Sequence, residues 1–173
     1  MKKLSLGLLT VALIASMHAC AQEDKSKRPS PPAKVSQKIN SGATITIDYS
    51  QPSIKGRTIG KDVEPMDGKV WRTGANEATV FETDKDLTVQ DGKLPAGKYG
   101  LFTIFDGNDV TVIFSKTWNQ WGAFKYSEKD DILRVKTKAS DASPASEKLT
   151  FKIDPSGLVT LLWGPKKAEF SVK

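Results

Sequence analysis

The sequence of 173 residues contains one cysteine and one histidine, and both lie close to its start, at Cys20 and His18. The remainder of the chain therefore has neither a thiol nor an imidazole. This excludes disulfide bonds within that remainder, zinc sites built on cysteine or histidine, and catalysis by a Ser-His-Asp or Cys-His arrangement. Carboxylates, amides, arginines and aromatic rings are left to carry any chemistry.

The chain also lacks an apolar run long enough to span a membrane. Residues 4–15 are almost wholly apolar, but a span needs about 20 such residues. Because two lysines precede this run, we expect a signal peptide over residues 1–21. Two processing routes fit: cleavage after the small residue Ala21, or lipidation of Cys20 behind an imperfect lipobox. Both predict an exported protein, either periplasmic or secreted, or an outer-membrane lipoprotein whose membrane contact is the lipid anchor.

Excess positive charge is scarce on the predicted domain, although the chain as a whole is basic. Of a net charge of +6, two charges come from the first three residues and three from residues 22–38, which leaves +1 for residues 39–173. A nucleic-acid-binding protein carries its basic residues on the folded domain. We therefore expect no nucleic-acid partner.

A polar segment follows the predicted signal peptide. Residues 22–33 (QEDKSKRPSPPA) are charged and proline-rich, and they show no apolar periodicity. Such a composition is typical of a flexible, disordered tether. We place a single folded domain at residues 34–173.

Within this domain, apolar residues recur at every second position. The alternation is clearest in residues 44–49, 148–153 and 167–172, and it predicts strands with one face in the core. Residues 99–105 and 158–163 are apolar throughout, which predicts strands covered on both faces.

Turn residues separate these runs, and no helical spacing extends beyond a turn or two. Asp91-Gly92 and the segment 106–109 each lie between alternating runs, as in hairpins. About ten short strands at even spacing predict an all-β fold, an antiparallel β-sandwich. One stretch, residues 50–69, has no pattern of its own. Loops of that length are uncommon and are often functional.

The densest polar cluster follows Trp71. Arg72, Asn76 and Glu77 provide a guanidinium, an amide and a carboxylate within six residues. If the chain bends here, Arg72 and Glu77 could meet around the carboxylate or hydroxyls of a small ligand, with Tyr49 as a further candidate. The alternative is that Trp71 fills the core and Arg72 and Glu77 form a structural ion pair.

A second candidate site is aromatic. Trp118, Trp121, Phe124 and Tyr126 fall within nine residues, beside the amide of Asn119. Sugar-binding surfaces use rings to stack on the pyranose and amides to bind its hydroxyls, which makes Trp118 and Trp121 candidate ligand-binding residues. The alternative is an aromatic corner that closes one end of the sandwich.

Other chemistry finds little support. The carboxylates lie at expected turns, where aspartate bonds locally, and the segment 106–109 lacks the full calcium-loop pattern. Residues 94–104 contain glycines but lack the Lys-Ser/Thr ending of a phosphate loop. We predict no metal, no cofactor and no identifiable catalytic residue.

Five sequence blocks together resemble one bacterial family. They are AKVSQKI (33–39), IDYSQPSIKGR (47–57), KVWRTGANEAT (69–79), LPAGKYGLFTI (94–104) and NQWGAF (119–124). In these blocks the chain is similar to domain-of-unknown-function family 2911, a family of exported proteins. The resemblance implies no established activity, so it adds no catalytic residue.

Three functions remain open. The sequence favours a non-catalytic envelope protein that binds a small molecule or a glycan. A structural or assembly role in the envelope comes second, and a His-independent hydrolase or lyase that uses Arg72 and Glu77 comes third. The sequence leans against an enzyme and predicts no particular oligomeric state.

Overall fold

The structure, a computed structural model, describes residues 24–173. The predicted signal peptide and the candidate lipidation site Cys20 lie outside the described residues. The described part is all-β, which confirms the predicted fold class, and none of its helices is long and apolar enough to cross a membrane. Its strands are β1 (Pro32–Lys38), β2 (Thr44–Ser50), β3 (Val70–Trp71), β4 (Thr79–Thr83), β5 (Leu87–Val89), β6 (Gly92–Leu94), β7 (Gly97–Asp106), β8 (Asp109–Ser115), β9 (Asp131–Ile153) and β10 (Leu158–Ser171), with the short 3-10 helices η1 (Lys25–Lys27) and η2 (Glu128–Asp130).

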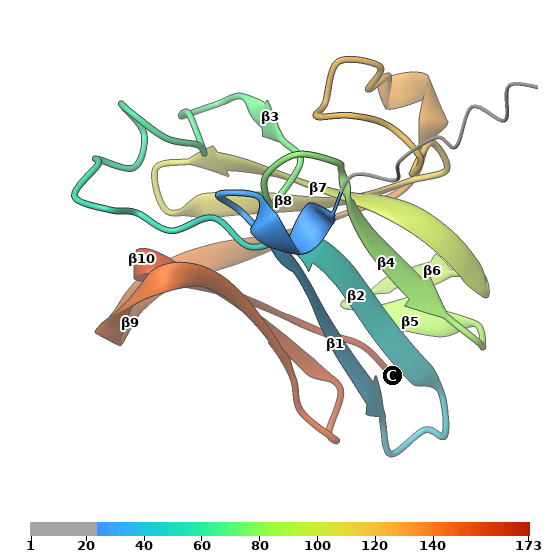
Figure 1. The fold of residues 1–173 in the computed structure, drawn as a ribbon. Coiled ribbons are helices and arrows are strands. Elements are labelled where there is room, and N and C mark those ends of the chain that lie inside the picture. The colour runs from blue at the N-terminus through green and yellow to red at the C-terminus, as the bar shows by residue number, and fades with distance from the viewer. Residues whose placement is uncertain (1–23) are drawn as a thin grey trace, which may run out of the picture.

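One curled antiparallel sheet makes up most of the fold. Its strands follow the order β1-β2-β4-β7-β8-β9-β10, with β3 paired to β7, while β5 and β6 form a separate hairpin. The long strand β9 pairs with β8 through residues 131–138 and with β10 through residues 139–153. It therefore carries the sheet from one layer of the sandwich into the other (Figure 1). A bridge between Ser53 and Lys148 joins the end of the β2 side to β9 and closes the curl.

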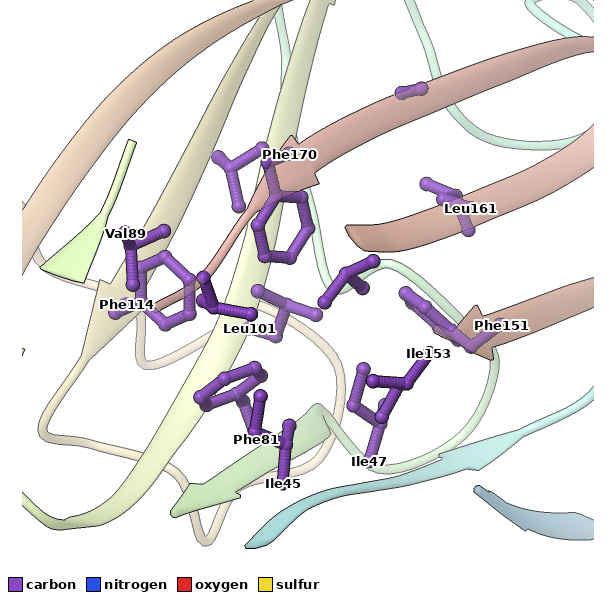
Figure 2. Packing of buried hydrophobic residues seen from close by; sticks show 14 of the residues in the cluster. Ile45, Ile47, Phe81, Val89, Leu101, Phe114, Phe151, Ile153, Leu161 and Phe170 are labelled. Atoms are coloured by element: carbon purple, nitrogen blue, oxygen red, sulfur yellow. The ribbon is translucent and has the colours of Figure 1, made fainter. Parts of the chain in front are cut away.

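The core lies between the two layers, and side chains from most of the strands meet there (Figure 2). Ile45 and Ile47 of β2 are fully buried, whereas Thr44 and Thr46, which alternate with them, are half-buried, as the sequence pattern predicts. Phe81 of β4 meets Phe114 of β8 edge-to-face, with ring centroids 5.0 Å apart. Phe114 in turn contacts Phe170 of β10 at 6.0 Å, so the aromatic contacts cross from layer to layer.

Two strands were expected to be buried on both faces, and one of them is. In β7, Leu101 faces the main core, while Phe102 packs on the other face in a smaller cluster with Ile113. In β10, Leu161 and Trp163 are buried but Leu158 is 38% exposed. The prediction for residues 158–163 is wrong, because only one face of this strand packs against the opposite layer.

The irregular stretch between β2 and β3 packs against β10. Ile59 contacts the core, and the indole N–H of Trp163 donates a hydrogen bond to the carbonyl oxygen of Glu64 at 2.8 Å. Gly164 of β10 has a φ of +59°, and a Cβ there would press against the Ile59 side chain. Residues 51–69, which we call the β2–β3 loop, therefore form a fixed wall over β10 even though they contain little regular structure.

The segment that precedes β1 also contacts the domain. Asp24 caps η1 through a hydrogen bond from the Ser26 amide, and β1 then begins at Pro32, inside the predicted tether. The side-chain amide of Asn76 donates to the Ser30 carbonyl oxygen at 2.9 Å. Residues 24–31 thereby lie beside the start of β4 (Figure 1, blue).

Candidate functional site

Glu77 is the centre of a charged cluster just before β4. Arg28 donates from Nη1 to both carboxylate oxygens of Glu77 at 3.0 Å, and Lys25 donates from Nζ to Oε1 at 2.8 Å. Partial burial by itself raises the pKa of Glu77. Hydrogen bonds from Lys25, from its own backbone and from Arg28, together with the charge of Lys25, outweigh that effect and lower the pKa from 4.5 to about 2. Glu77 is therefore firmly ionised at neutral pH, as an ion-pair partner rather than a proton donor.

The same cluster holds Trp121. Glu77 and Trp121 form an antiparallel bridge, and the guanidinium of Arg28 lies 5.7 Å from the Trp121 ring centroid. The carbonyl oxygen of Asn76, a residue with a φ of +55°, accepts a hydrogen bond from the Gly122 amide. Three of the candidate residues, Asn76, Glu77 and Trp121, are thus brought together. All three contact the segment that precedes β1.

Trp118, Trp121 and Phe124 form an exposed aromatic surface on the loop between β8 and η2. Their exposed fractions are 38%, 54% and 85%. The buried Gln120 shapes this loop, since its amide nitrogen donates to the Thr117 carbonyl and its amide oxygen accepts from the Lys125 amide. Aromatic rings that stay in solvent on a loop held in this way are available to a partner.

A hollow of about 240 Å³ lies beside this surface. Trp118 and Glu77 both line it, and Lys98 lies 5.7 Å from the Trp118 ring centroid. The other polar residues of the lining come from strand β2, η1 and the aromatic loop: Lys25, Asp48, Tyr49, Ser50, Asn119 and Gln120. The hollow thus combines one indole with carboxylate, amide, hydroxyl and ammonium groups.

The fourth aromatic residue, Tyr126, behaves as the corner alternative predicts. Its ring packs on Phe102 at 5.0 Å, and its hydroxyl donates to Asp131 Oδ2 at 2.7 Å. Arg134 donates to the same oxygen at 2.6 Å. Burial raises the pKa of Tyr126, and the bond to Asp131 raises it further, to about 12 in spite of the nearby Arg134.

Tyr49 lines the same hollow as Glu77 and Trp118, whereas Arg72 lies apart from them. Most of the Tyr49 ring is buried edge-to-face on Phe151 at 5.0 Å, and its hydroxyl accepts a hydrogen bond from the Phe151 amide at 3.4 Å, so Tyr49 belongs both to the core and to the lining of the hollow. Arg72 lines a different cavity, of about 320 Å³, together with Glu64. Burial lowers the pKa of Arg72, and the charge of Glu64 partly offsets this. The structure thus does not bring Arg72 and Glu77 together around one ligand.

Two features of this region could not be read from the sequence. In the sequence, Lys25 and Arg28 are only two charges of the predicted tether, and nothing there links them to Glu77. The one available signal was the excess of positive charge in that segment, which favours pairing with an acidic group. A third cavity, of about 280 Å³, lies between the β2–β3 loop and β10 and is lined mainly by apolar groups such as Phe105 and Trp163.

Among residues 24–173, no cluster of three or more acidic side chains is placed to hold a metal ion.

Comparison with known proteins gives one informative result. The family described as "Protein of unknown function (DUF2911)" matches residues 30–172, a range that includes every candidate binding residue named above but not Lys25 or Arg28. No curated protein and no solved structure matches the chain. The match confirms the resemblance seen in the five sequence blocks and spans most of the chain, which therefore belongs to the DUF2911 family.

Proposed function

We propose that this protein is a non-catalytic binding protein of the cell envelope that recognises a glycan through its exposed aromatic surface. The observation that carries this proposal is the exposure of Trp118, Trp121 and Phe124 on one loop. Several large apolar rings exposed on one loop are typical of binding sites, because leaving them in water forgoes the free energy of burial. The envelope location rests on the signal peptide expected from the sequence.

The chemistry around the rings suits a sugar. An indole face accepts the C–H face of a pyranose, while the hydroxyls at the ring edge need hydrogen-bond partners. Carboxylates such as Asp48 and Glu77 accept from hydroxyls, and the Asn119 amide both donates and accepts. A few polar groups placed around an apolar surface are the usual composition of a small-molecule site.

The contacts that hold this loop in place also favour a binding site. Gln120 bonds to two backbone groups within it, and Trp121 is tied to Glu77 by a strand bridge. A site held in its binding geometry loses less conformational entropy when the ligand arrives. A loop that served only to connect β8 to η2 would not need to hold its rings outward.

The state of Glu77 favours binding over hydrolysis. A general acid or base works best when its pKa is near the working pH. With its pKa lowered to about 2, Glu77 stays an ionised hydrogen-bond acceptor and is poorly matched to a proton transfer.

A panel of envelope glycans tests the proposal. The processed protein would be titrated calorimetrically with soluble peptidoglycan fragments and with β-linked and α-linked oligosaccharides. Trp118→Ala and Trp121→Ala should each weaken binding by tenfold or more. Leu158→Ala is the matched control, because this side chain is as exposed as Trp118 but lies on β10, and its affinity should not change. An absence of saturable binding to every glycan, or equal affinity in the tryptophan variants, would contradict the proposal. Capture of a protein partner lost with Phe124→Ala would instead support an assembly role.

A further inference from the structure

Arg72 forms no ion pair within the described structure, although the charge of Glu64 acts on it from across the cavity. Its Nε is fully buried and has no hydrogen-bond partner. No carboxylate of residues 24–173 forms an ion pair with its guanidinium. A buried donor without a partner is destabilising, and a partly buried charge without one more so. Such a group calls for an explanation in a native structure.

The neighbouring charged groups are already occupied. Glu64 accepts a hydrogen bond at 2.8 Å from the Met66 amide, and Asp62 accepts one at 2.8 Å from the Thr58 amide. The Arg57 guanidinium, which lines the same cavity, donates to two carbonyl oxygens of the β2–β3 loop. Arg57 is thus anchored to the loop backbone, whereas the buried Nε of Arg72 has no partner.

Apolar side chains form about half of the walls of this cavity, and charged groups form most of the rest. Trp71 and Trp163 are both buried and line it, together with Met66 and Val63. Both indole N–H groups are already used, because Trp71 donates to the Gly74 carbonyl and Trp163 to the Glu64 carbonyl. A ligand that pairs with the Arg72 guanidinium would therefore also meet ring faces and methyl groups, with Arg57, Asp62 and Glu64 at the other walls.

We infer that this cavity binds a small organic monocarboxylate, whose two oxygens pair with the Arg72 guanidinium. The planar guanidinium presents parallel N–H donors that match the two oxygens of a carboxylate. The hydrocarbon or aromatic part of the ligand lies against Trp71 and Trp163. Asp62 and Glu64 also line the cavity, so a dianion such as phosphate would be repelled more strongly than a monoanion. This site is separate from the aromatic surface and does not depend on the proposed glycan binding.

Benzoate is a suitable probe, because it joins a carboxylate to a flat apolar ring. In ¹⁵N-labelled protein, the Arg72 Nε–H signal is assigned as the one lost in Arg72→Met. That signal should shift saturably as benzoate is added at constant ionic strength. Calorimetry should show at least tenfold weaker binding to Arg72→Met, and Arg72→Lys should also bind more weakly, since it keeps the charge but loses the paired donors. Lys152→Met removes one exposed positive charge from β9 and should bind as the unaltered protein does.

Further measurements with other ligands decide which class of anion the cavity binds. Acetate should bind more weakly than benzoate because it leaves the apolar walls uncovered, and sulfate and phosphate should compete poorly. Benzoate should also raise the melting temperature of the unaltered protein but not that of Arg72→Met, a readout that requires only that both proteins fold. Equal affinity for phosphate would overturn the monocarboxylate assignment. A benzoate titration that leaves the Arg72 Nε–H signal and the melting temperature unchanged would overturn the site.

Discussion

Replacing Glu77 by glutamine tests whether its ion pairs hold the segment before β1 on the domain. Glutamine keeps the size of the side chain and removes its charge. A fall in pKa from 4.5 to about 2 corresponds to at most about 3 kcal/mol of stability at neutral pH. The Glu77 side chain is 37% exposed, so solvent screens much of this, and exposed ion pairs contribute about 0.2–1 kcal/mol each. With two cations on one carboxylate, we expect Glu77→Gln to lower the free energy of unfolding by about 1–2 kcal/mol.

The pH dependence of this loss follows from the direction of the shift. The pKa of Glu77 is lower in the folded protein than in the unfolded chain, so its contribution is fully present above the unfolded value of 4.5. It disappears as the pH falls through about 2. The difference in stability between the unaltered protein and Glu77→Gln should therefore be constant from pH 8 to about 5.5 and shrink towards zero between pH 4.5 and 2.

Urea unfolding followed by tryptophan fluorescence at several pH values measures this difference. Glu82→Gln is the matched control, because Glu82 forms one exposed ion pair, with Lys98 at 3.2 Å, across β4 and β7. Its cost should stay below about 0.5 kcal/mol. If Glu77→Gln cost no more than Glu82→Gln, or if its cost did not change between pH 7 and pH 2, the ion pairs of Glu77 would not be what holds this segment.

Three further predictions concern the fold. Gly157→Ala should lower the free energy of unfolding by more than about 2 kcal/mol in urea denaturation, because φ is +89° and the new Cβ would collide with the Val172 carbonyl. The control Gly107→Ala, also at positive φ but in open space, should lower it by only about 1 kcal/mol. Phe81→Ala should cost about 3–5 kcal/mol in the same assay, because the ring is fully buried, and a cost below 1 kcal/mol would contradict its place in the core. In an absorbance titration at alkaline pH, one of the three tyrosines should ionise near pH 12, since burial and then its bond to an aspartate raise the pKa of Tyr126. Tyr126→Phe should remove that step, and removal of a different step would show the assignment to be wrong.

The fold could be predicted from the sequence because its rules are local. Alternation in β2 follows from burial of one face of a strand, and the unbroken apolar run in β7 follows from burial of both. The run in residues 158–163 looks the same but belongs to a strand with one open face. Composition alone could not separate these cases, because whether a second cluster covers a strand depends on residues far away in the chain.

The candidate site was less predictable, because it depends on pairings across long stretches of chain. Arg28 reaches Glu77 over 49 positions, and no spacing rule connects them. Arg72 and Glu77 are close in sequence, yet positive φ angles at Thr73 and Asn76 turn the chain between them, and they line different cavities. The aromatic residues were recognisable as a group, but which of them point outward was settled by the local hydrogen bonds of the loop.

The passage of β9 through both layers has a consequence for how the molecule folds. If β10 detached, the later half of β9 would lose its hydrogen-bond partners, and if β8 detached, the earlier half would. The two layers therefore gain their stability jointly, and neither half is an independent cooperative unit. The bridge between Ser53 and Lys148 joins residues 95 positions apart. The chain therefore loses the entropy of a long loop before the contacts at that bridge can stabilise the fold. Folding is accordingly expected to be slow for a chain of this size, and unfolding to occur in a single step.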